Sequence, residues 1–139
     1  MKSFKQLAVS VIFAALACAG LHAQTVYIRA EIPFNFHAGD KLMPAGQYFI
    51  HEEGPVVFLR TLDDANLSRA MITVGAAGRN PSRESKLVFN RYGSEYFLST
   101  IWDSYAEDGR QVLRTAREKE LAKRGNVSVP AIVTLASSK

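Results

Sequence analysis

The chain has 139 residues, of which 47% are hydrophobic, with 17 Lys and Arg against 13 Asp and Glu and a single cysteine, Cys18. This length is typical of one domain with a core of its own, and such a charge balance does not single out nucleic acid as a partner. One cysteine also excludes a disulfide within the chain.

The N-terminus has the pattern of an export signal. Lys2 and Lys5 precede an uncharged, apolar stretch from Leu7 to Gly20. A transmembrane helix needs about 20 apolar residues, and this stretch is shorter. It is followed by Ala23, a small residue of the kind preferred at a cleavage position. We therefore expect cleavage between Ala23 and Gln24.

This interpretation divides the chain into a signal peptide, residues 1–23, and one β-rich domain, residues 24–139. Cleavage after Ala19, lipidation of Cys18 and an uncleaved anchor are the open alternatives. The expected mature domain contains no cysteine and no transmembrane segment, and it has 15 basic residues and 13 acidic ones. Its location is periplasmic or extracellular, in a bacterial host, and nucleic acid is not expected as a partner.

Strand patterns occupy the first half of the expected domain. From Thr25 to Phe36, apolar and polar residues alternate with the period of a half-buried strand, and Pro33 interrupts the pattern. Turn residues rich in Gly, Pro, Asp and Asn then separate further short β-like runs. These runs are residues 47–51, 56–62 and 69–74.

The clearest local pattern is a hairpin formed by residues 86–92 and 95–102 around Gly93-Ser94. Glycine reaches positive φ without steric cost, which suits a two-residue turn. We expect Tyr92 to lie opposite Glu95. The same register places apolar residues on both faces of the hairpin. One face should therefore be covered by a facing sheet and the other by a helix, a ligand or a partner. The expected pairs are Tyr92 with Glu95, Phe89 with Leu98, and Leu87 with Thr100.

One helix is predicted near the C-terminus. Thr115 and Glu118 have the spacing of a capping box, and Gly125 ends the helical pattern. A last strand, residues 127–135, should lie at a sheet edge because Pro130 has no N–H to donate. The predicted fold is mainly β: an antiparallel β sandwich or small barrel of about six to eight strands with one short C-terminal helix.

Three segments of the chain resemble a family of small secreted bacterial β-rich proteins of unknown function. They are Ile-Pro-Phe-Asn-Phe at 32–36 with Gly39, Pro-Ala-Gly-Gln-Tyr at 44–48, and Lys-Leu-Val-Phe-Asn-Arg-Tyr-Gly at 86–93. The resemblance spans much of residues 26–102. It implies an exported β-rich domain, and it implies no activity, cofactor or catalytic residue.

Catalytic and metal-binding patterns are sparse in the expected domain. Only His37 and His51 could serve as a base for a serine hydrolase, and no Gly-x-Ser-x-Gly segment is present. Ser99 or Ser104, with Asp103, are the nominal partners. We expect both histidines to be solvated, without a fixed partner and without a chemical role.

Two segments carry candidate metal ligands. On a strand, at most His51 and Glu53 could converge, and two ligands do not make a zinc site. The second candidate is a calcium site in loop 103–109, which is rich in oxygen ligands, although its spacing differs from that of an EF-hand. We therefore predict no catalytic residue, no metal and no cofactor.

The function favoured by these observations is non-enzymatic: an exported binding or interaction domain of the bacterial cell envelope. Its partner would be an envelope component or another protein. Arg91 and Tyr92, beside the Gly93-Ser94 turn, are the predicted binding residues because exposed aromatic and basic groups often dominate interfaces. The first alternative is a small barrel that carries an apolar ligand, and the second alternative is a hydrolase.

Overall fold

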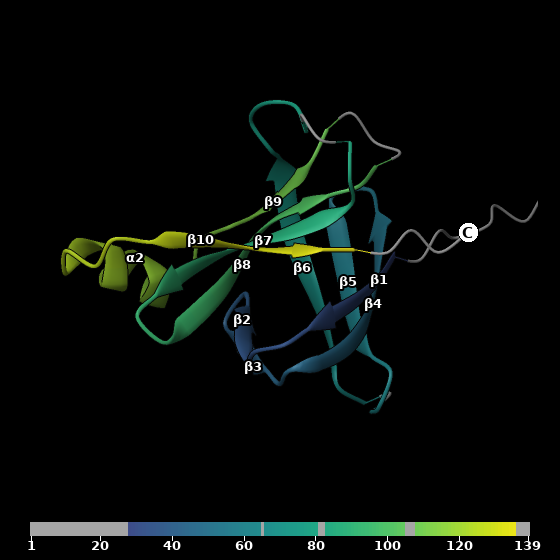
Figure 1. Cartoon of the computed structure of the whole chain (residues 1–139), viewed down its shortest axis with the longest axis horizontal. Coiled ribbons are helices and arrows are strands. Elements are labelled where there is room, and N and C mark those ends of the chain that lie inside the picture. Colours follow the sequence, from purple (N-terminus) through teal and green to yellow (C-terminus); the bar gives the residue numbers. More distant parts are fainter. Residues whose placement is uncertain (1–27, 65, 81–82, 105–107, 136–139) are drawn as a thin grey trace, which may run out of the picture.

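The computed structural model describes residues 28–64, 66–80, 83–104 and 108–135. These residues form a mainly β structure with a single short helix (Figure 1), which confirms the predicted fold class. The described ranges contain ten strands. They are β1 (Ile28–Ile32), β2 (Phe36–Ala38), β3 (Lys41–Met43), β4 (Gly46–Glu53), β5 (Val56–Thr61), β6 (Ser68–Gly75), β7 (Lys86–Tyr92), β8 (Glu95–Trp102), β9 (Arg110–Val112) and β10 (Val129–Thr134), with the helix α2 (Ala116–Lys123) before β10.

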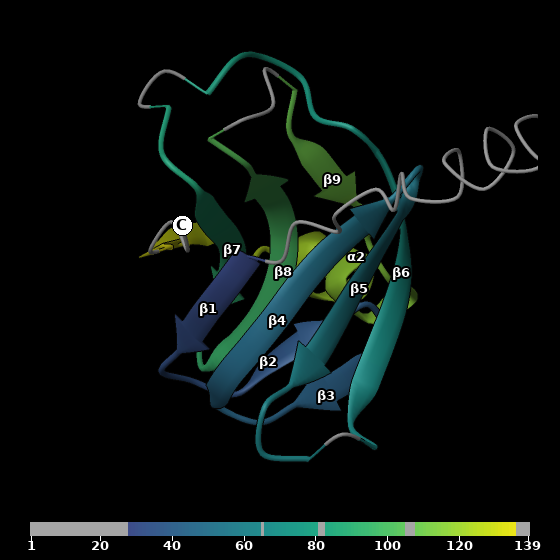
Figure 2. The same cartoon turned by 90° about the vertical axis from the view of Figure 1, so that its right-hand side faces the viewer.

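The strands form one curved, open sheet around a core. Its order is β1-β4-β5-β6-β9-β8-β2-β3, and β7 pairs with β8 and with β10. All pairings are antiparallel except a short parallel contact between β2 and β8. The layer of β1, β4, β5 and β6 faces the layer of β7, β8 and β9 (Figure 2). In the described part of the chain no pairing joins β1 to β10, so both remain edges.

The core between the two layers is filled by large apolar side chains. They come from inward-facing positions at the two-residue spacing of the strands. Aromatic rings meet edge to face there: Phe36 lies 5.4 Å from both Tyr48 and Phe89, measured between ring centroids. The largest fully buried side chains are Tyr48, Phe36, Phe89, Ile32, Met43, Ile50, Leu59, Leu87, Ile101 and Val57.

The predicted hairpin is present, and its turn contains Gly93 at φ 63°. Tyr92 pairs with Glu95 and Phe89 with Leu98, as expected. Further from the turn the predicted register is wrong, because Leu87 pairs with Ile101 rather than with Thr100. Val88 pairs with Thr100 and Phe89 with Leu98, so Ser99 is an extra residue in β8. Such a bulge reverses the direction of the side chains that follow.

The bulge explains why Ile101 is buried in the core while Trp102 is not. Trp102 instead packs against the backbone of Gly109, where a Cβ atom would lie only 2.6 Å from its ring. Only glycine therefore fits at position 109 without a shift of the indole.

The remaining local predictions concern the C-terminal region and the short strands. β10 is an edge strand that contains Pro130, and α2 begins and ends where the capping residues indicated. β2, β3 and β9 were not predicted, because three residues are too few to show a period. These additional strands bring the number in the described ranges above the expected six to eight.

Candidate binding site at the β7–β8 turn

The two residues predicted to bind a ligand lie on opposite faces of β7. Arg91 is exposed near the end of the strand. Tyr92 is only 4% exposed, because α2 covers that face of the hairpin. The expectation that Tyr92 offers an exposed aromatic ring is therefore wrong. The core covers one face of the hairpin, and on the other face α2 contacts the end near the turn, at Asn90, Tyr92 and Glu95.

Arg91 is held in a defined orientation. Its Nε donates a hydrogen bond to the carbonyl oxygen of Gly93 at 2.7 Å. Its Cζ lies 5.4 Å from the centroid of the Tyr96 ring, within the range of a cation–π contact. Within the described residues, the Nη groups of Arg91 have no hydrogen-bond acceptor. The guanidinium is thus fixed from one side and open on the other.

The ring below Arg91 is itself supported. Tyr96 stacks on Phe34 with centroids 3.8 Å apart and planes at 14°. Phe34 in turn meets the buried ring of Phe89 edge to face at 4.9 Å. Arg91, Tyr96 and Phe34 therefore form a column that rises from the core to the surface, and we call it the Arg91 column. A cation at the top of a rigid aromatic column is suited to an anionic group such as a carboxylate or phosphate.

On the other face, Tyr92 is part of a buried polar cluster. Glu118 of α2 is 4% exposed, and its Oε1 accepts hydrogen bonds from Asn90 Nδ2 at 2.9 Å and from Tyr92 Oη at 3.2 Å. Arg114 Nε lies 3.9 Å from the same oxygen. Burial, and secondarily the Glu118 carboxylate, raise the pKa of Tyr92. Tyr92 is therefore a neutral donor that helps to hold α2.

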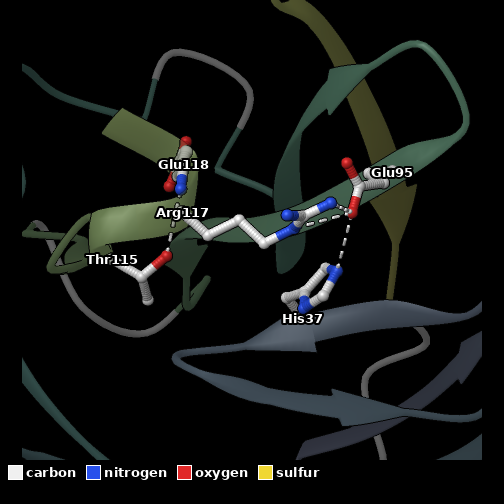
Figure 3. A network of polar contacts seen from close by, with 5 residues as sticks. All are labelled: His37, Glu95, Thr115, Arg117 and Glu118. Carbon is white, nitrogen blue, oxygen red and sulfur yellow. Dashed lines mark hydrogen bonds and ion pairs between the residues drawn. The ribbon is translucent and has the colours of Figure 1, made fainter. Parts of the chain in front are cut away.

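A second polar contact joins α2 to the start of β8 (Figure 3). Glu95 Oε1 accepts from Arg117 Nε at 3.0 Å and from Arg117 Nη2 at 2.8 Å. His37 Nε2 of β2 lies 3.6 Å from the same oxygen. Thr115 caps α2 by accepting the Glu118 backbone N–H at 3.3 Å. The Thr115 half of the predicted capping box is confirmed. Among the described residues the reciprocal bond from the Thr115 backbone N–H to the Glu118 carboxylate is not made, because that carboxylate is turned toward the sheet and accepts from Asn90 and Tyr92.

Both histidines differ from the expectation that they have no fixed partner. His37 stacks on Phe97 with centroids 4.4 Å apart, in addition to its contact with Glu95. His51 stacks on Phe58 at 4.7 Å and lies 3.4 Å from Glu53. The convergence of His51 and Glu53 follows the strand spacing. Aromatic neighbours on adjacent strands supply the stacking, and these are not evident in the local sequence.

The serines considered for catalysis have other partners. Ser99 Oγ lies 3.4 Å from Thr100 Oγ1, and the backbone N–H of Ser104 donates to Ser85 Oγ at 3.0 Å. Among the residues that the structure describes, neither Ser99 nor Ser104 contacts a histidine. Ser85 Oγ is 3.5 Å from Asp103 Oδ1. This arrangement gives no geometric basis for a serine nucleophile activated by His37 or His51.

A separate charged pair joins two strands that are not neighbours. Arg110 Nε of β9 lies 3.6 Å from Glu52 Oε2 of β4. Burial is the largest influence on Glu52 and raises its pKa, although the Arg110 charge acts in the opposite direction. Within the described ranges, no three His, Cys, Asp or Glu side chains are grouped to hold a metal ion. Residues 105–107 of the calcium alternative lie outside the described residues.

Neither protein-family models nor curated proteins nor solved structures gave a significant match to the chain. No described helix has the length and apolar character needed to cross a membrane. Sequence reasoning nominated Arg91 but did not reveal that Phe34 stacks on Tyr96 beneath it, because these two rings are far apart in the chain.

Proposed function

We propose that this protein is an exported, non-enzymatic binding domain of the bacterial cell envelope that contacts its partner at the Arg91 column. The observation that carries the proposal is the fixed guanidinium of Arg91, held by the Gly93 carbonyl and the Tyr96 ring. Its Nη donors are open. Fixing an arginine before binding reduces the entropy that is lost when a ligand arrives.

The packing of the core favours a surface site over the carrier alternative. A carrier barrel needs an unfilled interior to receive an apolar ligand. Here the inward-facing positions hold large side chains, among them Phe36, Tyr48 and Phe89, all fully buried. Opening a ligand cavity would separate these rings. Binding at the exterior requires no such change.

The chemistry of the column favours an anionic group that is attached to a flat or apolar body. Two Nη groups can donate in parallel to a carboxylate or phosphate. Tyr96, whose ring lies beneath the guanidinium, is half-buried and so offers apolar surface next to the charge. The predicted export signal and the resemblance to secreted bacterial proteins support an envelope location for such a partner.

Capture from a host envelope extract tests this proposal. Arg91→Gln removes the charge and leaves the strand intact, and Arg60→Gln is the matched control because Arg60 is another exposed arginine, on β5. We expect Arg91→Gln to reduce capture about tenfold or more and Arg60→Gln to have little effect. Circular dichroism checks the fold of each variant.

A second pair of variants separates binding from catalysis. Replacing His37 and His51 together by Asn should leave capture intact if no histidine has a chemical role. Loss of capture in the histidine double variant, with normal capture by Arg91→Gln, would contradict the binding site proposed here and would favour the hydrolase alternative.

A further inference from the structure

The helix α2 is attached to the sheet almost entirely by polar contacts. All eight of its residues are described, and Glu118 is the one buried residue among them. Its anchors are Glu118 with Asn90 and Tyr92, and Arg117 with Glu95. A helix that covers a core normally contributes an apolar stripe. Because α2 does not, most of its surface is available to solvent or to a partner.

The available surface of α2 is cationic. Arg114, Arg117, Lys119, Lys123 and Arg124 are exposed. Of the nearby carboxylates, Glu118 is buried, Glu95 is paired with Arg117, and Glu120 is paired with Arg124 at 2.8 Å. Lys119 and Lys123 are therefore uncompensated by an ion pair in the described part of the chain. Arg91, on the adjacent strand end, adds a third positive charge to this region.

Exposed aliphatic side chains follow directly after the helix. Val127 is 83% exposed and Val129 is 58% exposed. Val127 lies between α2 and β10, and Val129 is the first residue of β10. Their exposed side chains gain nothing from burial in the isolated molecule, but they can enter an apolar medium. We call residues 114–129 the helical tip. It combines basic groups, which anionic headgroups attract, with neighbouring exposed apolar side chains.

The position of the helical tip permits such contact. α2 and the chain that leads into β10 lie at one end of the long axis of the molecule (Figure 1). The contact between Arg117 and Glu95 places the β7–β8 turn beside them. The tip therefore projects beyond the curved sheet and can reach a flat surface without obstruction by the two layers of strands.

We infer that the helical tip docks reversibly on an anionic lipid bilayer, with Lys119 and Lys123 near the headgroups and Val127 inserted among them. The inference rests on the envelope location in the proposed function and adds a second contact that is separate from the Arg91 column. Negative lipid is the fitting partner because uncompensated lysines supply attraction and Val127 supplies burial. A soluble polyanion would use the lysines alone.

Vesicle co-sedimentation tests the inference. Vesicles of phosphatidylcholine with about a quarter phosphatidylglycerol are compared with pure phosphatidylcholine, at low and high salt. We expect binding to the anionic vesicles only, and binding that weakens as salt rises. The variants compared carry the same N-terminal residues, so differences between them belong to the positions changed.

Two matched pairs of variants assign the binding to the helical tip. Lys119→Gln with Lys123→Gln should lower the vesicle partition coefficient about tenfold or more, while Arg60→Gln with Arg79→Gln should change it less than about twofold. Val127→Ser should lower it about fivefold, while Ile72→Ser, at another exposed aliphatic residue on β6, should not. Equal losses in the tip and control variants would overturn the inference.

Soluble polyphosphate serves as the competing probe. If it binds as tightly as the vesicles do, and if its binding depends on the lysines while neither probe responds to Val127→Ser, the partner is a polyanion and the bilayer inference is wrong. The result of the vesicle test can be distinguished from the result of the Arg91 capture test. Failure of vesicle binding leaves capture through Arg91 intact, whereas failure of the Arg91 test leaves the lysine and Val127 results unchanged.

Discussion

The core between the sheet layers and the attachment of α2 are stabilised by different interactions. In the core, rings such as Phe36 and Phe89 exclude water and gain from burial and close packing. Beneath α2, one buried carboxylate satisfies two donors, and a partly exposed ion pair adds to it. The stability of the core increases with the apolar area that is buried, whereas the attachment of α2 depends on whether its polar groups have hydrogen-bond or ion-pair partners. α2 should therefore open more readily than the core.

The largest expected effect is in the core. Phe89→Ala should lower the free energy of unfolding by about 3–5 kcal/mol, because it removes a fully buried ring and its contacts with Phe34 and Phe36. Urea unfolding followed by circular dichroism measures this loss. The control, Ile72→Ala on the exposed face of β6, should change stability by no more than about 0.5 kcal/mol. Similar losses at both positions would remove the distinction between core and surface.

The next effect is at the buried carboxylate. Glu118→Ala leaves Asn90 Nδ2 and Tyr92 Oη without their acceptor, and we expect a loss of about 2–3 kcal/mol. Glu118→Gln, which keeps the shape and one acceptor, should cost less. The control Glu120→Ala affects only an exposed pair with Arg124 and should have a small effect. Equal costs for Glu118→Ala and Glu120→Ala would show that the buried cluster does not anchor α2.

A third effect appears only in alkali. Burial, and secondarily Asp63, raise the pKa of Tyr48 to about 12 from its ordinary value of 10.0. The folded state then binds more protons than the unfolded state between these values, so stability should fall as pH rises from 10 to 12. The slope should approach about 1.4 kcal/mol per pH unit. Urea unfolding at several alkaline pH values should show a shallower fall for Tyr48→Phe than for the parent protein.

The smallest predicted effect is at the helix cap. Thr115→Ala removes the acceptor for the Glu118 backbone N–H and should cost about 0.5–1 kcal/mol. Thr115→Ser retains a hydroxyl and should be close to neutral. Since we expect α2 to open more readily than the core, hydrogen exchange of its amides should report the loss more strongly than global unfolding does. An unchanged exchange rate in Thr115→Ala would mean that the cap contributes nothing.

Local sequence patterns were sufficient to predict much of this fold. Gly93 identified the hairpin turn, and Thr115 and Gly125 identified the ends of α2, because each effect depends on residues close in sequence. The bulge at Ser99 was not predictable, since it depends on how two long strands fit a curved sheet. The three-residue strands were missed for the reason that a period needs several residues.

The candidate site was predicted less completely than the fold. Arg91 was identified from its place beside the turn, but alternation alone does not say which face a distant helix covers, and so Tyr92 was expected to be exposed. The support that Tyr96 receives from Phe34 joins residues that are 62 positions apart. Contacts of that kind are set by the packing of layers, and neither residue type nor spacing reveals them.

The most direct test of the Arg91 column is an NMR measurement of the arginine Nε–Hε groups. We expect a resolved and slowly exchanging Arg91 signal, because its Nε–H is bonded to the Gly93 carbonyl. Inorganic phosphate should shift this signal at concentrations that leave the exposed Arg60 signal unchanged. A rapidly exchanging Arg91 signal, or equal phosphate shifts at Arg91 and Arg60, would contradict a preformed anion-binding site at the β7–β8 turn.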